Sequence, residues 1–163
     1  DMNNDWDATV ELLRRTGVKS SRKEVVPVFQ DIYLGKNWNG LIRKEKLLLD
    51  RRLLGKIGKK IAIVTGRPRE EARMAMRRIG LPESTLLVAM EDTKEGKPGP
   101  EPLLLAKKLA GAKFPLYIGD SASDRLAAAR TRSGFVAIGK GKTQAGEFAR
   151  FRDVNSALEE LFL

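Results

Sequence analysis

The stretch that decides the fold is Leu116-Tyr117-Ile118-Gly119-Asp120-Ser121-Ala122-Ser123-Asp124. Its first three residues predict a short buried strand, and Gly119 allows the chain to turn sharply where that strand ends. The sequence that begins at Asp124, Asp-Arg-Leu-Ala-Ala-Ala-Arg, strongly favours a helix. Two carboxylates, Asp120 and Asp124, are therefore expected in the loop between a strand and a helix.

Loops of this kind form binding sites at the carboxyl ends of strands in open parallel sheets. Two neighbouring carboxylates suit Mg²⁺, a hard cation that prefers carboxylate oxygen and water. A purely structural interpretation is also open, in which Asp124 caps the helix and Asp120 makes a turn. The other strand-end loops of the chain help to decide between these two interpretations.

Strands and helices alternate from Lys59 onward. This alternation predicts an α/β fold, a doubly wound parallel sheet with helices on both faces. Strands are expected at residues 61–64, 86–89, 116–118 and 135–138. Helices are expected at residues 69–79, 101–109 and 155–163, and a further helix is expected to begin at Asp124.

The first 58 residues predict helices and no convincing strand. A first helix is expected at residues 6–15, and a second is capped by Ser20 or Ser21, with Glu24 placed three residues after Ser21 as in a capping box. A third helical stretch is expected at residues 47–57. The chain therefore divides into a helical segment, residues 1–58, and an α/β core, residues 59–163.

Composition limits the possible chemistry. An apolar share of 42% in 163 residues is enough for a hydrophobic core, in one domain or in one domain with a small accessory piece. The chain has no cysteine and no histidine, which excludes disulfides, thiolate metal sites and His-based catalysis. No membrane-length apolar run and no signal peptide are visible, so a cytoplasmic protein without membrane partners is the default expectation.

The formal net charge of +10 indicates attraction either to nucleic acid or to small anions. The basic residues are spread along the chain in pairs on predicted helices, where a solvated face explains them. Aromatic residues make up only 6% and do not alternate with arginine, which argues against a single-strand stacking platform. We therefore expect no specific nucleic-acid partner, and only weak, salt-sensitive binding.

Two further loops carry polar residues suited to a phosphate. Thr65-Gly66-Arg67 follows the first expected strand, where a hydroxyl and backbone N–H groups before a helix can hold a phosphate oxygen. Lys97 precedes a helix in Gly96-Lys97-Pro98-Gly99-Pro100, whose prolines stiffen the approach and fix the ammonium. In isolation, an ordinary turn is the favoured interpretation of Thr65-Gly66-Arg67, and Lys97 is one of many surface lysines.

Taken in this order, the motifs resemble those of the haloacid dehalogenase superfamily of phosphohydrolases, over roughly residues 59–140. Thr65 matches its second motif, Lys97 its third, and Gly119-Asp120-Ser121-x-x-Asp124 its fourth. The resemblance implies that Thr65 and Lys97 bind the transferring phosphoryl group. It also implies that Asp120 holds Mg²⁺ directly, and that Asp124 acts through water or by positioning the lysine. The first segment resembles the small helical cap of phosphoglycolate-phosphatase-like members.

The first motif of that family is a buried strand ending in Asp-x-Asp, whose acids are the nucleophile and the acid/base. The sequence Asp5-Trp6-Asp7 matches this Asp-x-Asp pattern, so Asp5 and Asp7 are weak candidates for these roles. The four residues before Asp5 cannot form a central apolar strand, however, and residues 6–13 have a helical pattern. We favour the alternative that the chain begins inside the cap and that the first strand is missing.

In the family, the missing strand lies between the strands expected at 61–64 and 116–118. Three outcomes are open for the backbone groups that its absence leaves unpaired. The two flanking strands pair directly, the stretch Gly40 to Leu49 fills the gap, or a missing N-terminal segment or second chain donates a strand. We favour the third outcome.

Two classes of function follow. One is a Mg²⁺-dependent phosphatase that acts on a small phosphorylated metabolite through an aspartyl-phosphate, and that is truncated or inactive as this chain. The other is a non-catalytic fragment or pseudoenzyme of the same fold, acting as an anion-binding or interaction module. The sequence upstream of Asp1 in the gene would discriminate between them.

Overall fold

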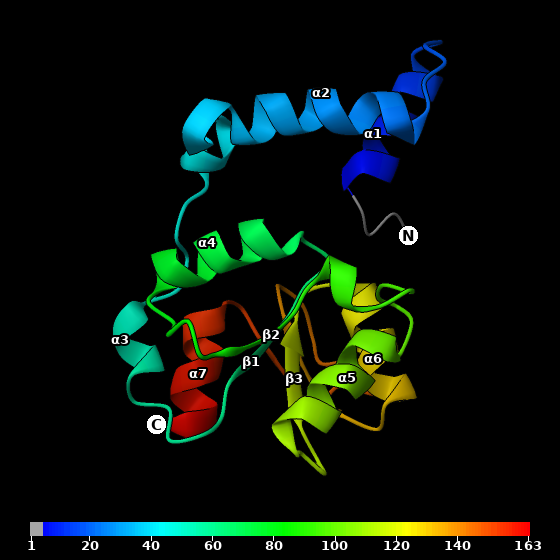
Figure 1. Cartoon of the computed structure of the whole chain (residues 1–163). Coiled ribbons are helices and arrows are strands. Elements are labelled where there is room, and N and C mark those ends of the chain that lie inside the picture. The colour runs from blue at the N-terminus through cyan, green and yellow to red at the C-terminus, as the bar shows by residue number, and fades with distance from the viewer. Residues whose placement is uncertain (1–4) are drawn as a thin grey trace. The chain divides into compact units, whose positions relative to one another are not determined.

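The computed structural model describes residues 5–163 and contains two compact units (Figure 1). The first unit ends at Lys46 and the second is Leu47–Leu163. The division thus falls earlier than the boundary expected after residue 58, because the intervening residues bind to the C-terminal helix. The backbone N–H of Asp50 donates to Asn155 Oδ1 at 2.8 Å, and Asn155 Nδ2 donates to the carbonyl of Leu48 at 3.0 Å.

The first unit is helical, as predicted. It contains α1 (Asp5–Arg15), α2 (Arg22–Leu34) and two short 3₁₀ helices, η1 (Lys36–Trp38) and η2 (Leu41–Lys44). Helices α1 and α2 pack against each other. The predicted capping box is present, since Ser21 Oγ accepts from the Glu24 N–H and the Ser21 N–H donates to Glu24 Oε2.

The second unit alternates strands and helices. Its strands are β1 (Ala62–Val64), β2 (Leu86–Val88), β3 (Leu116–Gly119), β4 (Gly134–Ile138) and β5 (Ala149–Phe151). Its helices are α3 (Arg51–Leu54), α4 (Arg69–Ile79), η3 (Met90–Asp92), α5 (Glu101–Ala110), α6 (Ala122–Arg130) and α7 (Val154–Phe162). Within the described chain, none of the helices is both long enough and apolar enough to cross a bilayer.

Two predicted elements differ from the structure. The helix expected at residues 47–57 is only α3, because Asp50 caps it by accepting from the Arg52 N–H at 3.0 Å and it stops before Gly55. Helix α6 begins at Ala122 rather than at Asp124, because Ser121 is its N-cap and Asp124, the third residue of the helix, completes the capping box. The sequence analysis missed β5, whose three residues are too few for a periodic pattern.

Every strand pair is parallel, and helices cover both faces of the strands. Neighbouring residues of β1 point to opposite sides. Ile63 packs against a cluster that includes Ala72 and Met76 of α4, whereas Val64 packs against one that contains Leu103 of α5. The doubly wound α/β architecture is therefore confirmed.

The strands form two separate sheets, β1-β2 and β3-β4-β5. Within residues 5–163, β1 pairs only with β2, and β3 pairs only with β4. The flanking strands thus do not close the gap by pairing directly. The stretch Gly40 to Leu49 does not form a strand there either, because its regular element is the 3₁₀ helix η2 and none of its residues is in a strand.

Candidate functional site

The carboxylate of Asp124 lies at the centre of a hydrogen-bond network at the carboxyl end of β3. Its Oδ1 accepts from Lys97 Nζ at 2.6 Å and from the Tyr117 hydroxyl at 2.9 Å. Its Oδ2 accepts from the backbone N–H of Asp120 at 3.2 Å, and from the N–H and Oγ of Ser121 at 3.1 and 2.8 Å. Five protein donors therefore hold this one carboxylate.

The local sequence explains how the carboxylate is placed. Ser121 is the N-cap of α6, and its Oγ accepts from the Asp124 N–H at 3.1 Å while donating to the Asp124 side chain. Asp124 sits in the first turn of the helix, where a negative charge is favoured by the helix dipole. The N-cap is thus Ser121 rather than Asp124, and Asp124 completes the capping box while its carboxylate also contacts Lys97.

Lys97 and Asp124 form a buried ion pair. The exposed fractions of their side chains are 13% and 6%. The loop that carries Lys97 is fixed at its next residue, because Arg130 Nη1 of α6 donates to the carbonyl of Pro98 at 2.7 Å. Because an ion pair held away from water is screened little, the lysine stays close to the end of β3. The structure thus brings two of the predicted site residues, Lys97 and Asp124, into direct contact.

Tyr117 is the site residue that the sequence analysis missed. Its hydroxyl lies 3.0 Å from Lys97 Nζ and donates to Asp124 Oδ1. It occupies a strand position that the pattern assigned to the core, and only the two-residue alternation along β3, which places it on the same face as Gly119, pointed to the site. Burial, and then the charge of Asp124, raise the pKa of Tyr117, which keeps the hydroxyl protonated.

The environment also keeps Asp124 ionised. Burial disfavours the charged carboxylate, but the hydrogen bond and charge of Lys97, followed by the hydrogen bonds from Ser121 and Tyr117, outweigh it. The pKa of Asp124 therefore lies below its ordinary value. At neutral pH the site contains a lysine–carboxylate pair rather than a neutral acid.

Asp120 and Asp124 differ in how well they suit a metal. Asp120 is exposed, whereas the two oxygens of Asp124 already accept five hydrogen bonds. Residues 5–163 contain no cluster of three or more acidic, His or Cys side chains that could surround a cation. Mg²⁺ binds through one or two carboxylates together with waters and substrate phosphates, so Asp120 fits a direct ligand. Asp124 fits the role of positioning the lysine.

The loop after β1 is ordered by its own backbone. The Thr65 N–H donates to the carbonyl of Val88 at 3.0 Å, and Thr65 Oγ1 accepts from the Arg67 N–H at 3.1 Å. Val64, the residue before Thr65, packs against the same cluster as Tyr117, which places the ends of β1 and β3 on one core. The phosphate-binding role of Thr65, Gly66 and Arg67 remains a prediction.

Asp5 and Asp7 lie in a helix rather than at the end of a strand. Both are in the first turn of α1, where the Asp5 carbonyl accepts from Thr9 Oγ1 at 2.7 Å and Asp7 Oδ1 lies 3.7 Å from Arg22 Nε. Both residues are exposed. This geometry agrees with the alternative that the segment is a cap helix, and it differs from the buried Asp-x-Asp strand end of the family.

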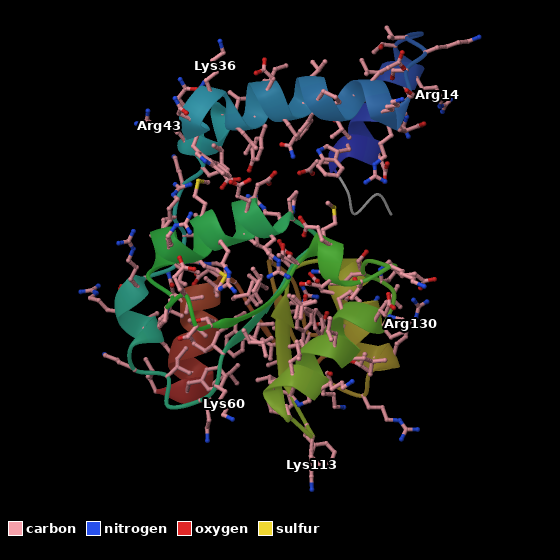
Figure 2. The ribbon with its side chains drawn as sticks, in the orientation of Figure 1. Arg14, Lys36, Arg43, Lys60, Lys113 and Arg130 are labelled. Atoms are coloured by element: carbon pink, nitrogen blue, oxygen red, sulfur yellow. The ribbon has the colours of Figure 1, made fainter. Side chains whose placement is uncertain are left out.

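The basic side chains are spread over the surface. Figure 2 shows Lys60, Lys113 and Arg130 projecting from separate parts of the second unit, and Arg14, Lys36 and Arg43 on different elements of the first.

Two curated proteins match the chain. It is 32% identical over 149 residues to a protein of Phytophthora nicotianae named imidazoleglycerol-phosphate dehydratase, covering 84% of this chain and 32% of that protein. It is 40% identical over 72 residues to Pyrophosphatase PpaX of Halalkalibacterium halodurans, covering 42% of this chain and 34% of that protein. The chain therefore spans about a third of the length of these relatives.

A solved structure and a family description agree with the fold and the motifs. The crystal structure of a hydrolase from Pseudomonas syringae matches with a TM-score of 0.72 and 22% identity, over 99% of this chain and 81% of that one. Residues 9–138 match the family described as haloacid dehalogenase-like hydrolase, which spans the Thr65, Lys97 and Asp120–Asp124 motifs. The chain belongs to the haloacid dehalogenase-like hydrolase family.

Proposed function

We propose that this chain is the core of a Mg²⁺-dependent phosphatase that cleaves a small phosphorylated metabolite through an aspartyl-phosphate. The observation that carries the proposal is the ammonium of Lys97, which is held 2.6 Å from Asp124 Oδ1 at the carboxyl end of β3. A buried, oriented cation at this edge of a parallel sheet suits a phosphoryl group. The name of the Halalkalibacterium relative makes inorganic pyrophosphate the first substrate to test.

In this proposal each site residue has one task. Lys97 offsets the charge of the phosphoryl oxygens, and Asp124 holds Lys97 in place. The Thr65 hydroxyl and the backbone N–H of Gly66 receive further phosphoryl oxygens, in a loop that the Arg67 N–H orders by donating to Thr65 Oγ1. Asp120 holds Mg²⁺, which when bound neutralises phosphoryl charge and orients the group for in-line attack.

The covalent step needs an aspartate nucleophile facing Lys97. We propose that it arrives on a strand inserted between β1 and β3, supplied by a further segment of the gene product or by a second chain. Two observations support an inserted strand. β1 and β3 are not paired with each other, and Val64 and Tyr117 nevertheless pack against one cluster. In the attack, a carboxylate oxygen bonds to phosphorus as the leaving oxygen departs, and water then cleaves the aspartyl-phosphate.

A second function is favoured by the position of Asp5 and Asp7. Because Asp5-Trp6-Asp7 lies in helix α1, this Asp-x-Asp sequence does not place a nucleophile at a strand end. A chain that binds phosphate without cleaving it would be a non-catalytic anion-binding or interaction module of this fold.

Hydrolysis assays distinguish these functions. We expect little or no Mg²⁺-dependent hydrolysis of p-nitrophenyl phosphate or pyrophosphate by the chain alone. A longer chain cloned from the gene, with its upstream segment, should be active, and its Lys97→Met variant should lose that activity. Activity of the 163-residue chain that disappears in Asp5→Asn would contradict the inserted strand and make Asp5 the nucleophile. An inactive longer chain that still binds phosphate would support the non-catalytic module.

A further inference from the structure

We propose that Tyr117 is the positioning residue of this site, whose hydroxyl fixes the direction of the Lys97 ammonium toward a bound phosphoryl group. The inference rests on the proposed function for its ligand, inorganic phosphate or a phosphoryl group. It assigns a role to a residue that lies outside the motifs Thr65, Lys97 and Asp120–Asp124.

The three polar atoms form a closed triangle. Lys97 Nζ lies 2.6 Å from Asp124 Oδ1 and 3.0 Å from the Tyr117 hydroxyl, which itself lies 2.9 Å from Asp124 Oδ1. Because the phenol donates its proton to the carboxylate, its oxygen is left to accept from the ammonium. The lysine therefore has two acceptors at fixed positions, whereas a single carboxylate oxygen would let the ammonium swing around it.

Tyr117 is held in place by its strand and by packing. It lies in the middle of β3, in register with Phe135 of β4, and its ring centroid is 6.3 Å from that of Phe135. It also packs against the cluster that contains Leu103 and Ala127. Lys97, in contrast, has four rotatable side-chain bonds and comes from a loop. A lysine loses much rotamer freedom when it is fixed, and a preset partner reduces the cost of binding a ligand.

The chain contains its own matched control. It has only two tyrosines, and the other, Tyr33, donates its hydroxyl to Glu45 Oε1 at 2.5 Å in the first unit. Tyr33→Phe and Tyr117→Phe therefore each remove one phenol–carboxylate hydrogen bond, but only Tyr117→Phe touches Lys97. General effects of losing such a bond are common to both variants, and effects on the lysine are not.

The first readout is the order of Lys97, measured by NMR of its ¹⁵N-labelled ammonium group in the full chain. We expect a protected, ordered Lys97 signal in the wild type and in Tyr33→Phe, and a mobile or exchange-broadened one in Tyr117→Phe. A Lys97 signal that remains ordered in a folded Tyr117→Phe protein would overturn the proposal. This readout does not depend on phosphate binding.

The second readout is the affinity for inorganic phosphate, measured by calorimetry. Losing one hydrogen bond to a charged group predicts an affinity about tenfold weaker in Tyr117→Phe and unchanged in Tyr33→Phe. In a Lys97→Met background, Tyr117→Phe should add no further loss, because the tyrosine acts through the lysine. Additive losses would overturn the proposal. The two readouts can also disagree. If Lys97 is disordered in Tyr117→Phe but the wild type binds no phosphate, the positioning role of Tyr117 is supported and only the proposed function is contradicted.

A third measurement needs no variant in the site. With ¹³Cζ-labelled tyrosine the chain gives two signals, which Tyr33→Phe assigns. Phosphate should shift the Tyr117 signal and leave that of Tyr33 unchanged. A Tyr117 signal that stays constant while phosphate binds would overturn the proposal even if Tyr117→Phe failed to fold.

Discussion

A Cβ atom on Gly119 would lie 2.6 Å from the Cβ of Asp124 and 2.7 Å from its Cγ and Oδ2. The glycine at the end of β3 is thus required by the close approach of the carboxylate. Gly119→Ala should displace Asp124 from its backbone donors and lower the free energy of unfolding by about 1–3 kcal/mol. Urea denaturation, with the Lys97 signal in NMR, measures both effects.

Gly134→Ala is the matched control for this change. Gly134 lies in the neighbouring parallel strand, and its nearest obstacle is the flexible end of the Leu116 side chain, at 3.0 Å. Gly134→Ala should lower the free energy of unfolding by less than Gly119→Ala does, and it should leave Lys97 ordered. Equal effects of the two substitutions would show that the approach of Gly119 to Asp124 does not hold the site.

Asp120 and Asp124 should respond differently to the loss of their charge. Asp124→Asn leaves Lys97 buried without a full partner charge, and should lower the free energy of unfolding by about 3–5 kcal/mol. Asp120→Asn, at an exposed position, should change it by less than about 0.5 kcal/mol and weaken Mg²⁺ binding instead. Thermal unfolding and Mg²⁺ titration monitored by NMR separate these outcomes. Similar destabilisation by both would contradict the two roles.

Much of the second unit could be predicted from its sequence, because strands such as β1 and β3 are short apolar runs with a glycine at or just beyond their carboxyl ends. The division of the strands into two sheets could not be predicted, since it depends on contacts between segments that are distant in the sequence. At the site, the loops after strands indicated Lys97 and Asp124. Tyr117 could not be predicted, because a tyrosine within an apolar run looks the same whether it fills the core or contacts an ion pair.

The turn after β2 should make stability depend on acid pH. The Ala89 N–H donates to Asp92 Oδ2 at 2.8 Å, and with the Arg69 guanidinium it lowers the pKa of Asp92 against the opposing effect of burial. A lowered pKa means that the carboxylate stabilises the fold above its ordinary pKa of 3.8, and that this contribution fades as pH falls through the lower folded value.

Asp92→Asn should therefore lower the free energy of unfolding by about 0.5–1 kcal/mol at neutral pH, as expected for a partly exposed ion pair. The difference from wild type should shrink below pH 3.8, where the unfolded-state group is protonated. Urea denaturation of both proteins across the acid range measures this difference in the free energy of unfolding. A difference that stays constant down to the acid transition would show that Asp92 acts by shape rather than by charge.

A strand inserted between β1 and β3 should stabilise the second unit. Unpaired N–H and C=O groups at a strand edge accept an added strand readily. A synthetic apolar peptide of about eight residues ending in Asp-x-Asp should raise the melting temperature of the chain. A peptide of the same composition with an internal proline is the control, because proline removes a ladder donor. Equal effects of the two peptides would argue against strand insertion.

The central claim is that Lys97, held by Asp124, binds a phosphoryl group. Calorimetric titration of inorganic phosphate into the wild-type chain, Lys97→Met and Lys113→Met tests it most directly, since Lys113 is an exposed lysine of the same unit. We predict one saturable site in the wild type and in Lys113→Met, and a much weaker but still measurable one in Lys97→Met. Phosphate binding that is unchanged in a folded Lys97→Met protein, or that falls equally in Lys113→Met, would contradict the account.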